Sequence, residues 1–266
     1  MKISPAHIVG REVGPEKQLL DARWLAAYSA ALGETAFPHP LFPVCYEWPT
    51  TRLLRERAGL ARLDPRLVHA QHDLIIHRAP TTEVLRVSGK VVAVMQRRPG
   101  ALVVFRFVAH DARDAPVTTT DFSVLYRDVE LEGGERAIEQ VEDPPSHRRR
   151  MEKVGEIEVA ATAAHVYTEC ARIWNPIHTD VAYARAAGLP GTILHGTATL
   201  ALSVSKALTS FGITPSSLRR VRCRFAGMVL MPSVLSVFAA TEGTSLAFET
   251  RNERGEAVVE RGWISG

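Results

Sequence analysis

The chain has 266 residues, of which 46% are hydrophobic and 23% are charged. This is the composition of a globular protein, and it excludes collagen-like, coiled-coil and wholly disordered chains. The net charge of +3 is too small to indicate a nucleic-acid partner. Three widely spaced cysteines form neither a disulfide framework nor a zinc motif. No segment resembles a signal peptide or approaches ~18 uninterrupted apolar residues, so we expect a cytoplasmic protein with no membrane partner.

Each half of the chain begins with a predicted amphipathic helix. Apolar residues at three-and-four spacing run from Leu20 to Leu32 and end at Gly33. A comparable stripe in the second half lies within residues 166–174 and is halted by Pro176. A further apolar segment follows each of these helices, at residues 39–48 and 194–212.

Each half then ends in a run of predicted strands. In the first half they cover residues 84–96, 100–112 and 116–129, which are rich in Val, Thr and aromatic residues. In the second half they cover residues 218–229, 233–243, 244–255 and 256–266. A helix followed by an antiparallel meander, present twice, predicts an α+β fold with each sheet wrapped around one long helix.

The two halves are separated by a segment with the composition of a linker. Residues 131–152 contain Gly and Pro pairs, many charges and little apolar periodicity. We therefore predict an N-terminal repeat over residues 1–130, a linker over 131–152 and a C-terminal repeat over 153–266.

The segment with the most candidate catalytic residues runs from Asn175 to Thr197. It places His178 just after the helix that Pro176 breaks, and it places a His195–Gly196 pair at the start of the next apolar helix. A glycine at a helix N-terminus exposes backbone N–H groups, which suit a developing oxyanion. A nearby histidine can transfer a proton at neutral pH. Taken singly, a scaffold histidine and an ordinary turn also explain these residues.

This segment resembles the signature of the MaoC-like acyl dehydratases, the (R)-specific enoyl-CoA hydratases of the hotdog fold. That signature runs roughly Ser-Gly-Asp-x-Asn-Pro-Leu-His and continues to Ile-Leu-His-Gly, and the match covers Ala171 to Leu202. Weaker similarity at residues 68–71, 77–80, 224–225 and 231–233 extends over the chain and resembles two-repeat hydratases. The resemblance implies a double hotdog, in which a degenerate N-terminal repeat and a C-terminal MaoC-like repeat form a pseudo-dimer.

The resemblance also implies an activity, which is hydration of a 2-enoyl-CoA to a 3-hydroxyacyl-CoA, or the reverse, without a cofactor or a metal. It assigns proton transfer to His178, a supporting position to Asn175 and polarisation of the thioester carbonyl to the amide of Gly196. The residues that it places against the substrate are His195, Thr197, Arg224 and Phe225. An acyl-CoA thioester is the implied partner, and a homodimer is one option for assembly.

The sequence departs from the family pattern at the catalytic Asp, where it has Ile173. An isoleucine side chain can neither accept a proton nor orient a water molecule. Three explanations are open: another carboxylate of the same half substitutes, the first half supplies one, or His178 acts alone. The candidate carboxylates are Glu169, Asp180, Glu34 and Asp73. The non-catalytic interpretation is that Glu169 is a solvated helix residue and that Asp180 caps the next helix. A non-catalytic acyl-CoA-binding protein or partner subunit, and an acyl-CoA thioesterase, are the alternative functions.

Two further groups of residues are candidate binding sites. His69 and His77 share one face of an extended strand while His72 points the other way, so we predict no metal site there. The alternating residues Arg220, Arg222 and Arg224 share a strand face, which is either solvated or directed at the phosphates of coenzyme A.

Overall fold

The computed structural model describes residues 1–34, 38–147 and 149–266. These residues divide into two units, and we describe each by itself. Unit 1 comprises Met1–Leu20, Tyr46–Arg78 and Glu83–Asp143, and unit 2 comprises Asp21–Cys45, Ala79–Thr82 and Pro144–Gly266. Unit 2 therefore contains a segment from the first half of the sequence. The repeat boundaries stay a prediction, because a unit defined by contacts is not a sequence repeat.

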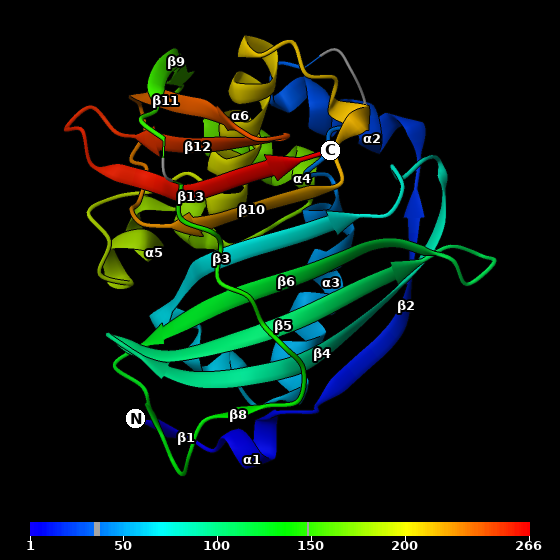
Figure 1. The fold of residues 1–266 in the computed structure, drawn as a ribbon. Coiled ribbons are helices and arrows are strands. Elements are labelled where there is room, and N and C mark those ends of the chain that lie inside the picture. The colour runs from blue at the N-terminus through cyan, green and yellow to red at the C-terminus, as the bar shows by residue number, and fades with distance from the viewer. Residues whose placement is uncertain (35–37, 148) are drawn as a thin grey trace. The chain divides into compact units, whose positions relative to one another are not determined.

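Unit 1 is built on an antiparallel sheet with the strand order β2-β4-β5-β6-β3 (Figure 1). These strands are β2 (Glu12–Leu20), β3 (Leu67–Ile76), β4 (Glu83–Arg97), β5 (Gly100–His110) and β6 (Pro116–Arg127). The short strand β8 (Arg136–Ala137) pairs with β4, and β1 (Lys2–Ile3) pairs with β7 (Glu130–Leu131) in parallel. The helices are α1 (Pro5–Ile8), α3 (Pro43–Arg57) and the 3-10 helix η1 (Ala61–Arg66).

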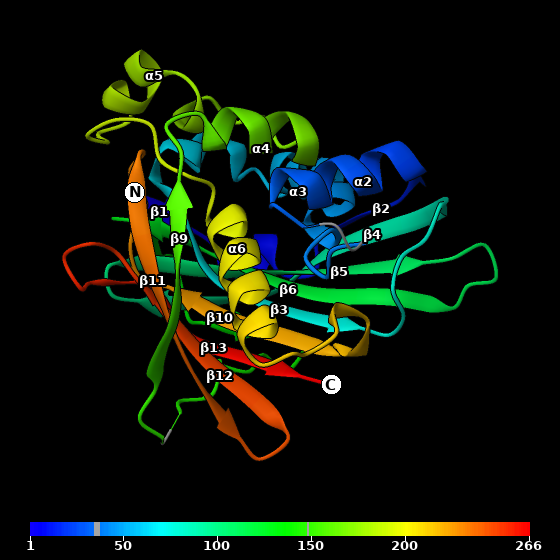
Figure 2. The ribbon, with the colours of Figure 1, turned by 90° about the horizontal axis from the view of Figure 1, so that it is seen from above.

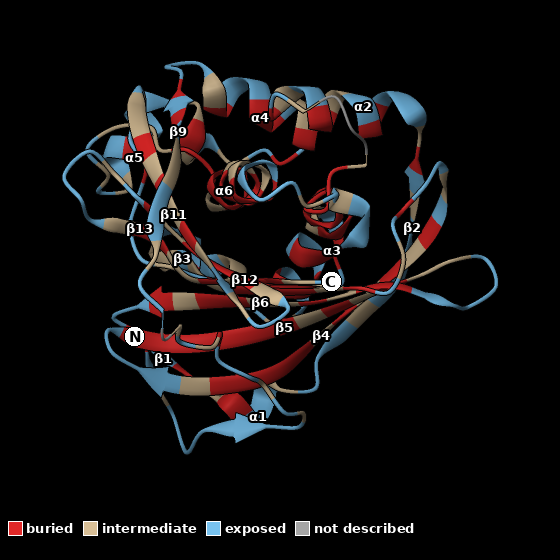
Figure 3. Cartoon of the chain, turned by 45° about the horizontal axis from the view of Figure 1, so that its top comes forward, coloured by how far each residue is buried: buried red, intermediate tan, exposed pale blue. Residues whose placement is uncertain are grey.

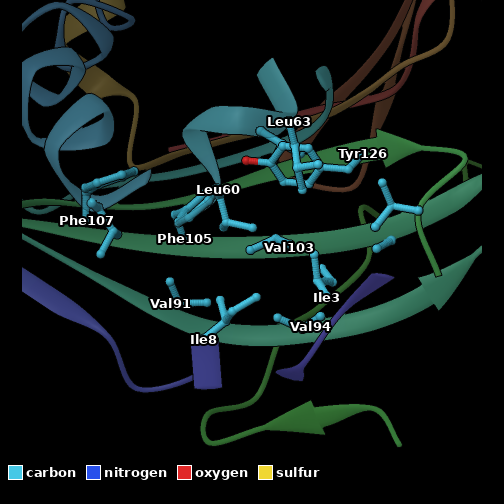
Figure 4. Close-up of a cluster of buried hydrophobic side chains, with 14 residues drawn as sticks. Ile3, Ile8, Leu60, Leu63, Val91, Val94, Val103, Phe105, Phe107 and Tyr126 are labelled. Carbon is cyan, nitrogen blue, oxygen red and sulfur yellow. The ribbon is translucent and has the colours of Figure 1, made fainter. Parts of the chain in front are cut away.

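Helix α3 packs on the sheet of unit 1 through both polar and apolar contacts. The Tyr46 and Thr118 hydroxyls lie 2.8 Å apart, and the Thr120 hydroxyl donates to the Glu47 carboxyl group at 2.7 Å. Unit 1 also contains an apolar cluster that includes Ile3, Ile8, Leu60, Leu63, Val91, Val94, Val103, Phe105, Phe107 and Tyr126 (Figure 4). Full burial of one such Val, Leu or Phe side chain contributes roughly 1.5–3 kcal/mol.

Unit 2 contains a second antiparallel sheet, with the order β10-β13-β12-β11-β9 (Figure 2). Its strands are β9 (Glu152–Val159), β10 (Arg220–Phe225), β11 (Ser233–Glu242), β12 (Ser245–Arg251) and β13 (Ala257–Ser265). Its α-helices are α2 (Ala22–Ala31), α4 (Ala163–Ala171), α5 (Val181–Ala186) and α6 (Gly196–Ser210), with 3-10 helices η2 (Pro176–His178) and η3 (Pro215–Ser217). Helix α6 packs against β9, β11, β12 and β13, and α2 lies beside α4.

Helix α6 is the central helix of unit 2 and is largely buried (Figure 3). Its sequence, GTATLALSVSKALTS, is rich in small residues, which allow the helix to approach the sheet closely. The Ser203 hydroxyl donates to the carbonyl of Thr199 and accepts a hydrogen bond from Thr250 of β12 at 2.7 Å. The buried Ser203 hydroxyl is therefore paired as both donor and acceptor within unit 2.

The structure confirms the α+β class and most of the predicted elements. The helix stripes within residues 20–33 and 166–174 correspond to α2 and α4, and every predicted strand is present, with shifted bounds. Strands β2 and β9 were not predicted. Part of the segment predicted as a linker packs within unit 1. Its strand β8 pairs with β4, and its Glu139 forms an ion pair with Arg106 of β5. Arg148, within that segment, lies outside the described residues.

Within the described residues, no helix has the length and apolar character that crossing a membrane requires.

Candidate functional site

His178 is held by the turn that follows α4. The Asn175 side chain accepts the N–H of Ile177 at 3.4 Å and so caps η2, which ends at His178. Nδ1 of His178 lies 2.8 Å from the carbonyl oxygen of Ile193. Because a carbonyl can only accept, Nδ1 carries the proton and Nε2 keeps its lone pair. Nε2 makes no hydrogen bond within the described part of the chain, so it is available as a proton acceptor.

The imidazole of His195 is stacked on that of His178. The ring centroids lie 3.6 Å apart and the ring planes differ by 23°. Nε2 of His195 lies 3.3 Å from both the Ile173 carbonyl and the Thr168 hydroxyl, so Nε2 carries the proton. Nδ1 of His195 is buried and has no partner among the residues described. The two histidines predicted from the sequence therefore form one stacked pair.

Burial keeps both imidazoles neutral. Desolvation lowers the pKa of His178 to about 4, and the hydrogen bond to Ile193 opposes this shift only in part. Desolvation and the neighbouring His178 together hold the pKa of His195 well below its usual value. At neutral pH the pair therefore presents a base, not a cation.

The N-terminus of α6 begins directly after this pair and lacks a cap. His195 occupies the N-cap position without a side-chain hydrogen bond. The backbone N–H groups of Gly196, Thr197 and Ala198 have no acceptor among the described residues. A helix end without internal partners is normally satisfied by water or a ligand. These donors and the positive end of the helix dipole suit a carbonyl oxygen that gains negative charge.

The protein's own packing does not require glycine at position 196. A Cβ atom built there would meet only the Phe225 ring, at 3.4–3.7 Å, which is ordinary van der Waals contact. The backbone at Gly196 is also not left-handed. The absence of a side chain leaves the amide open to the approach of a ligand.

The structure brings most of the predicted site residues together in unit 2. His178, His195, Gly196 and Thr197 are adjacent, Asn175 supports the loop, and Phe225 faces Gly196. Arg224 instead pairs with Glu260 of β13 at 3.3 Å. The register shift at Arg222 and Arg224 has its extra residue in β13, so it does not interrupt the alternation of β10. Arg222 is buried and Arg224 is exposed, and a shared strand face for the arginines stays a prediction.

None of the candidate carboxylates in unit 2 contacts His178. The Ile173 side chain is buried, with 5% exposure. Glu169 accepts from the indole of Trp174 at 3.4 Å. Asp180 accepts the N–H of Tyr183 at 2.9 Å and caps α5, which is its plain interpretation. Within the described residues, the His178 imidazole is hydrogen-bonded to backbone alone.

The residues that support the histidine pair were not predicted from the sequence. Tyr167 packs against His195 with a centroid distance of 4.9 Å, and Thr168 is hydrogen-bonded to it. Tyr28, from the first half of the sequence, lies 3.2 Å from the Tyr167 hydroxyl. Tyr28 and Tyr167 were assigned only to apolar helix stripes, and no local signal reveals contacts across 139 residues.

The histidines of β3 in unit 1 are arranged differently from the prediction. A register shift between His69 and Gln71 turns His69 toward His72, with ring centroids 5.5 Å apart. The expectation that His72 points the other way is therefore wrong. The Nε2 of His77 lies 3.0 Å from the Thr119 hydroxyl. Across the described ranges, no three His, Cys, Asp or Glu side chains are grouped to hold a metal ion.

Comparison with known proteins finds sequence similarity in this part of the chain. Residues 143–261 match the model of the MaoC like domain. Over 221 residues the chain is 27% identical to peroxisomal multifunctional enzyme type 2 of Drosophila melanogaster. That match covers 81% of this chain and 37% of the enzyme, so the chain spans little more than a third of that relative's length.

Solved structures show the same fold over the whole chain. A MaoC-like dehydratase from Phytophthora capsici superimposes with a TM-score of 0.88 at 18% identity, covering 99% of this chain and 97% of that one. A Mycobacterium tuberculosis protein described as a double hotdog superimposes with a TM-score of 0.60 at 14% identity, covering 96% and 94%. The chain therefore has a double hotdog fold, and its residues 143–261 are similar to the MaoC like domain.

Proposed function

We propose that this protein is a hydratase or dehydratase acting on an acyl thioester, with coenzyme A as the thiol. The observation that carries the proposal is the position of the neutral His178, whose Nε2 is free. Its ring is stacked on His195, the residue that directly precedes the uncapped N-terminus of α6. A base and a set of amide donors at one place are what addition of water to an enoyl thioester needs.

A single imidazole can perform the reaction with atoms and electrons in balance. Nε2 of His178 takes a proton from water while the water oxygen bonds to C3 of the enoyl group. The π electrons move to the thioester oxygen, which the N–H of Gly196 stabilises. The imidazolium then returns its proton to C2 and the carbonyl re-forms. Dehydration is the same path reversed, and no carboxylate is needed in either direction.

The test is direct. Crotonyl-CoA and longer 2-enoyl-CoA esters lose their conjugated absorbance on hydration, and we expect this loss with the intact protein. His178→Ala should lower the rate by at least about 10²-fold, since a positioned proton carrier contributes 10²–10⁴-fold. His165→Ala is the matched control, because His165 is an exposed histidine on the adjacent helix α4. An activity that His178→Ala leaves intact contradicts the proposal.

A second function is favoured by one observation, the buried Ile173 where the family carries its acid. A non-catalytic acyl-CoA-binding protein would keep the amide donors and lose the proton-handling pair. Titration calorimetry with butyryl-CoA distinguishes the two: tight binding without turnover of any enoyl-CoA supports a binder. In that case Ile173→Asp should introduce hydration. Release of free thiol from acyl-CoA would instead identify a thioesterase.

A further inference from the structure

Three helices of unit 2 contribute to a buried chain of hydroxyl groups behind the candidate site. The Tyr28 hydroxyl of α2 lies 3.2 Å from the Tyr167 hydroxyl of α4. The Tyr167 hydroxyl donates to Thr197 Oγ1 of α6 at 3.0 Å. Tyr28 and Tyr167 are fully or almost fully buried, and Thr197 is only 9% exposed. Burial of three hydroxyl groups is costly unless they are hydrogen-bonded in an ordered way.

The donors in this chain run toward α6. Tyr167 has one hydroxyl proton, and it is given to Thr197. Any hydrogen bond between the two tyrosines therefore has Tyr28 as its donor. The Tyr28 hydroxyl also lies 3.3 Å from the carbonyl oxygen of Leu41, so its one proton is shared between these two acceptors. Thr197 Oγ1 receives a hydrogen bond, and its own proton has no acceptor in the described part of the chain.

That uncommitted proton is located at the uncapped end of α6. Thr197 follows Gly196, whose backbone N–H also has no acceptor among the residues described. A buried donor without a partner is uncommon in native proteins and indicates a ligand or a catalytic role. Two donors of different kinds, one amide and one hydroxyl, are therefore available at consecutive residues.

We propose that the Thr197 hydroxyl is a second donor to the thioester carbonyl, beside the Gly196 amide, and that Tyr167 is the positioning residue that orients it. This inference rests on the proposed function. Because Tyr167 occupies a lone pair of Oγ1, the threonine proton is directed away from the tyrosine. The Tyr167 ring is itself fixed against His195. A donor that is oriented before the substrate arrives stabilises developing charge without reorganisation.

Kinetics of single and double variants test the proposal. Thr197→Val keeps the shape of the side chain and removes the donor, so kcat for enoyl-CoA hydration should fall by about 10²-fold with KM little changed. Thr197→Ser keeps the hydroxyl and should retain most of the activity. Ser203→Ala is the control, since it removes a buried hydroxyl of α6 that is paired elsewhere.

Tyr167→Phe tests the positioning role. It removes the hydroxyl and keeps the ring against His195, and it should lower kcat by about tenfold or less, the effect of one neutral hydrogen bond. Because Tyr167 acts through Thr197, the double variant should be no slower than Thr197→Val alone. Additive losses in the double variant would overturn the positioning role, and unchanged kcat in Thr197→Val would overturn the donor.

A spectroscopic readout separates this inference from the proposed function. The carbonyl stretching frequency of bound [1-¹³C]butyryl-CoA should rise in Thr197→Val and not in Ser203→Ala, because one hydrogen bond to the carbonyl is lost. This shift is expected even if no enoyl-CoA is hydrated, in which case the donor is kept and hydration is rejected. Equal frequencies in the parent protein and Thr197→Val reject the donor, and no binding of the thioester rejects both proposals.

Discussion

Glycine is a poor helix former, yet residue 196 occupies a helix position that has room for a side chain. A Cβ atom there meets only the Phe225 ring at contact distance, and alanine favours a helix over glycine by up to about 1 kcal/mol. The glycine is therefore explained by what approaches the helix from outside the chain. The protein gives up a little helix stability and keeps an accessible amide.

Gly196→Ala should separate stability from activity. We expect urea unfolding to show an unchanged free energy of unfolding or a gain of up to about 1 kcal/mol. The added methyl group meets the incoming thioester, so kcat/KM for enoyl-CoA hydration should fall at least tenfold. The stability measurement is the internal control, because a misfolded variant would lose both. An alanine variant that is as active as the parent would show that no ligand approaches this amide closely.

The pH dependence of hydration follows from the state of His178. Because burial lowers its pKa to about 4, the imidazole is a neutral base throughout the physiological range. We expect kcat/KM to be constant from about pH 6 to 8 and to fall only as the pH approaches the folded-state pKa. An ordinary histidine, with a pKa near 6.5, would give a half-maximal rate at that pH. A step in the profile near pH 6.5 would show that the base is a solvated group and not this stacked imidazole.

At the scale of elements, Asp180 can be tested as a helix cap. It accepts the N–H of Tyr183 at the start of α5. Asp180→Ala should lower the free energy of unfolding by about 1 kcal/mol, the usual effect of losing such a cap. Asp180→Asn keeps a capping oxygen and removes the carboxylate, so it should leave both stability and hydration unchanged. A large loss of kcat in Asp180→Asn would instead make Asp180 the substitute for the missing acid.

Periodicity predicted the helices and most of the strands because each of them buries one face. The stripe from Leu20 to Leu32 became α2, and the alternating valines of residues 84–96 became β4. Strand β2 was not predicted because Glu12–Leu20 is mostly exposed and contains a Pro, so it lacks the alternation of buried and exposed residues. The face of His72 relative to His69 was misjudged because a bulge in β3 shifts the register, and a local pattern does not reveal a bulge.

The candidate site was predictable where its parts are close in the sequence. The signature from Asn175 to Gly196 predicted the histidine pair and the open helix end, since only seventeen residues lie between His178 and Gly196. Its support was not predictable, because Tyr28 reaches Tyr167 across 139 residues through packing of α2 on α4. The environment of Ile173 also depended on packing, which places its carbonyl against His195.

At the scale of the whole molecule, buried ionisable groups couple stability to pH in two opposite directions. Burial lowers the pKa of several histidines, namely His39, His69, His72, His178 and His195. Below about pH 6.5 the unfolded chain binds protons at these histidines that the folded chain does not, so stability falls with falling pH. Burial also raises the pKa of Glu47 from 4.5 to about 8, so there the folded chain holds the extra proton.

These two effects predict a maximum of stability near pH 7. At pH 6.5 about half of the five histidines of the unfolded chain still bind a proton, so they outweigh the single Glu47 proton and the free energy of unfolding should rise with pH up to about pH 7. Above about pH 7 the Glu47 proton outweighs the histidines, and the free energy of unfolding should fall as the pH rises toward 8. Urea unfolding at closely spaced pH values measures this curve. Glu47→Gln keeps an oxygen for the Thr120 hydroxyl and cannot ionise, so it should abolish the decline above about pH 7. Glu56→Gln, which alters an exposed residue of the same helix α3, should preserve it. A decline that persists in Glu47→Gln would show that another group holds the proton.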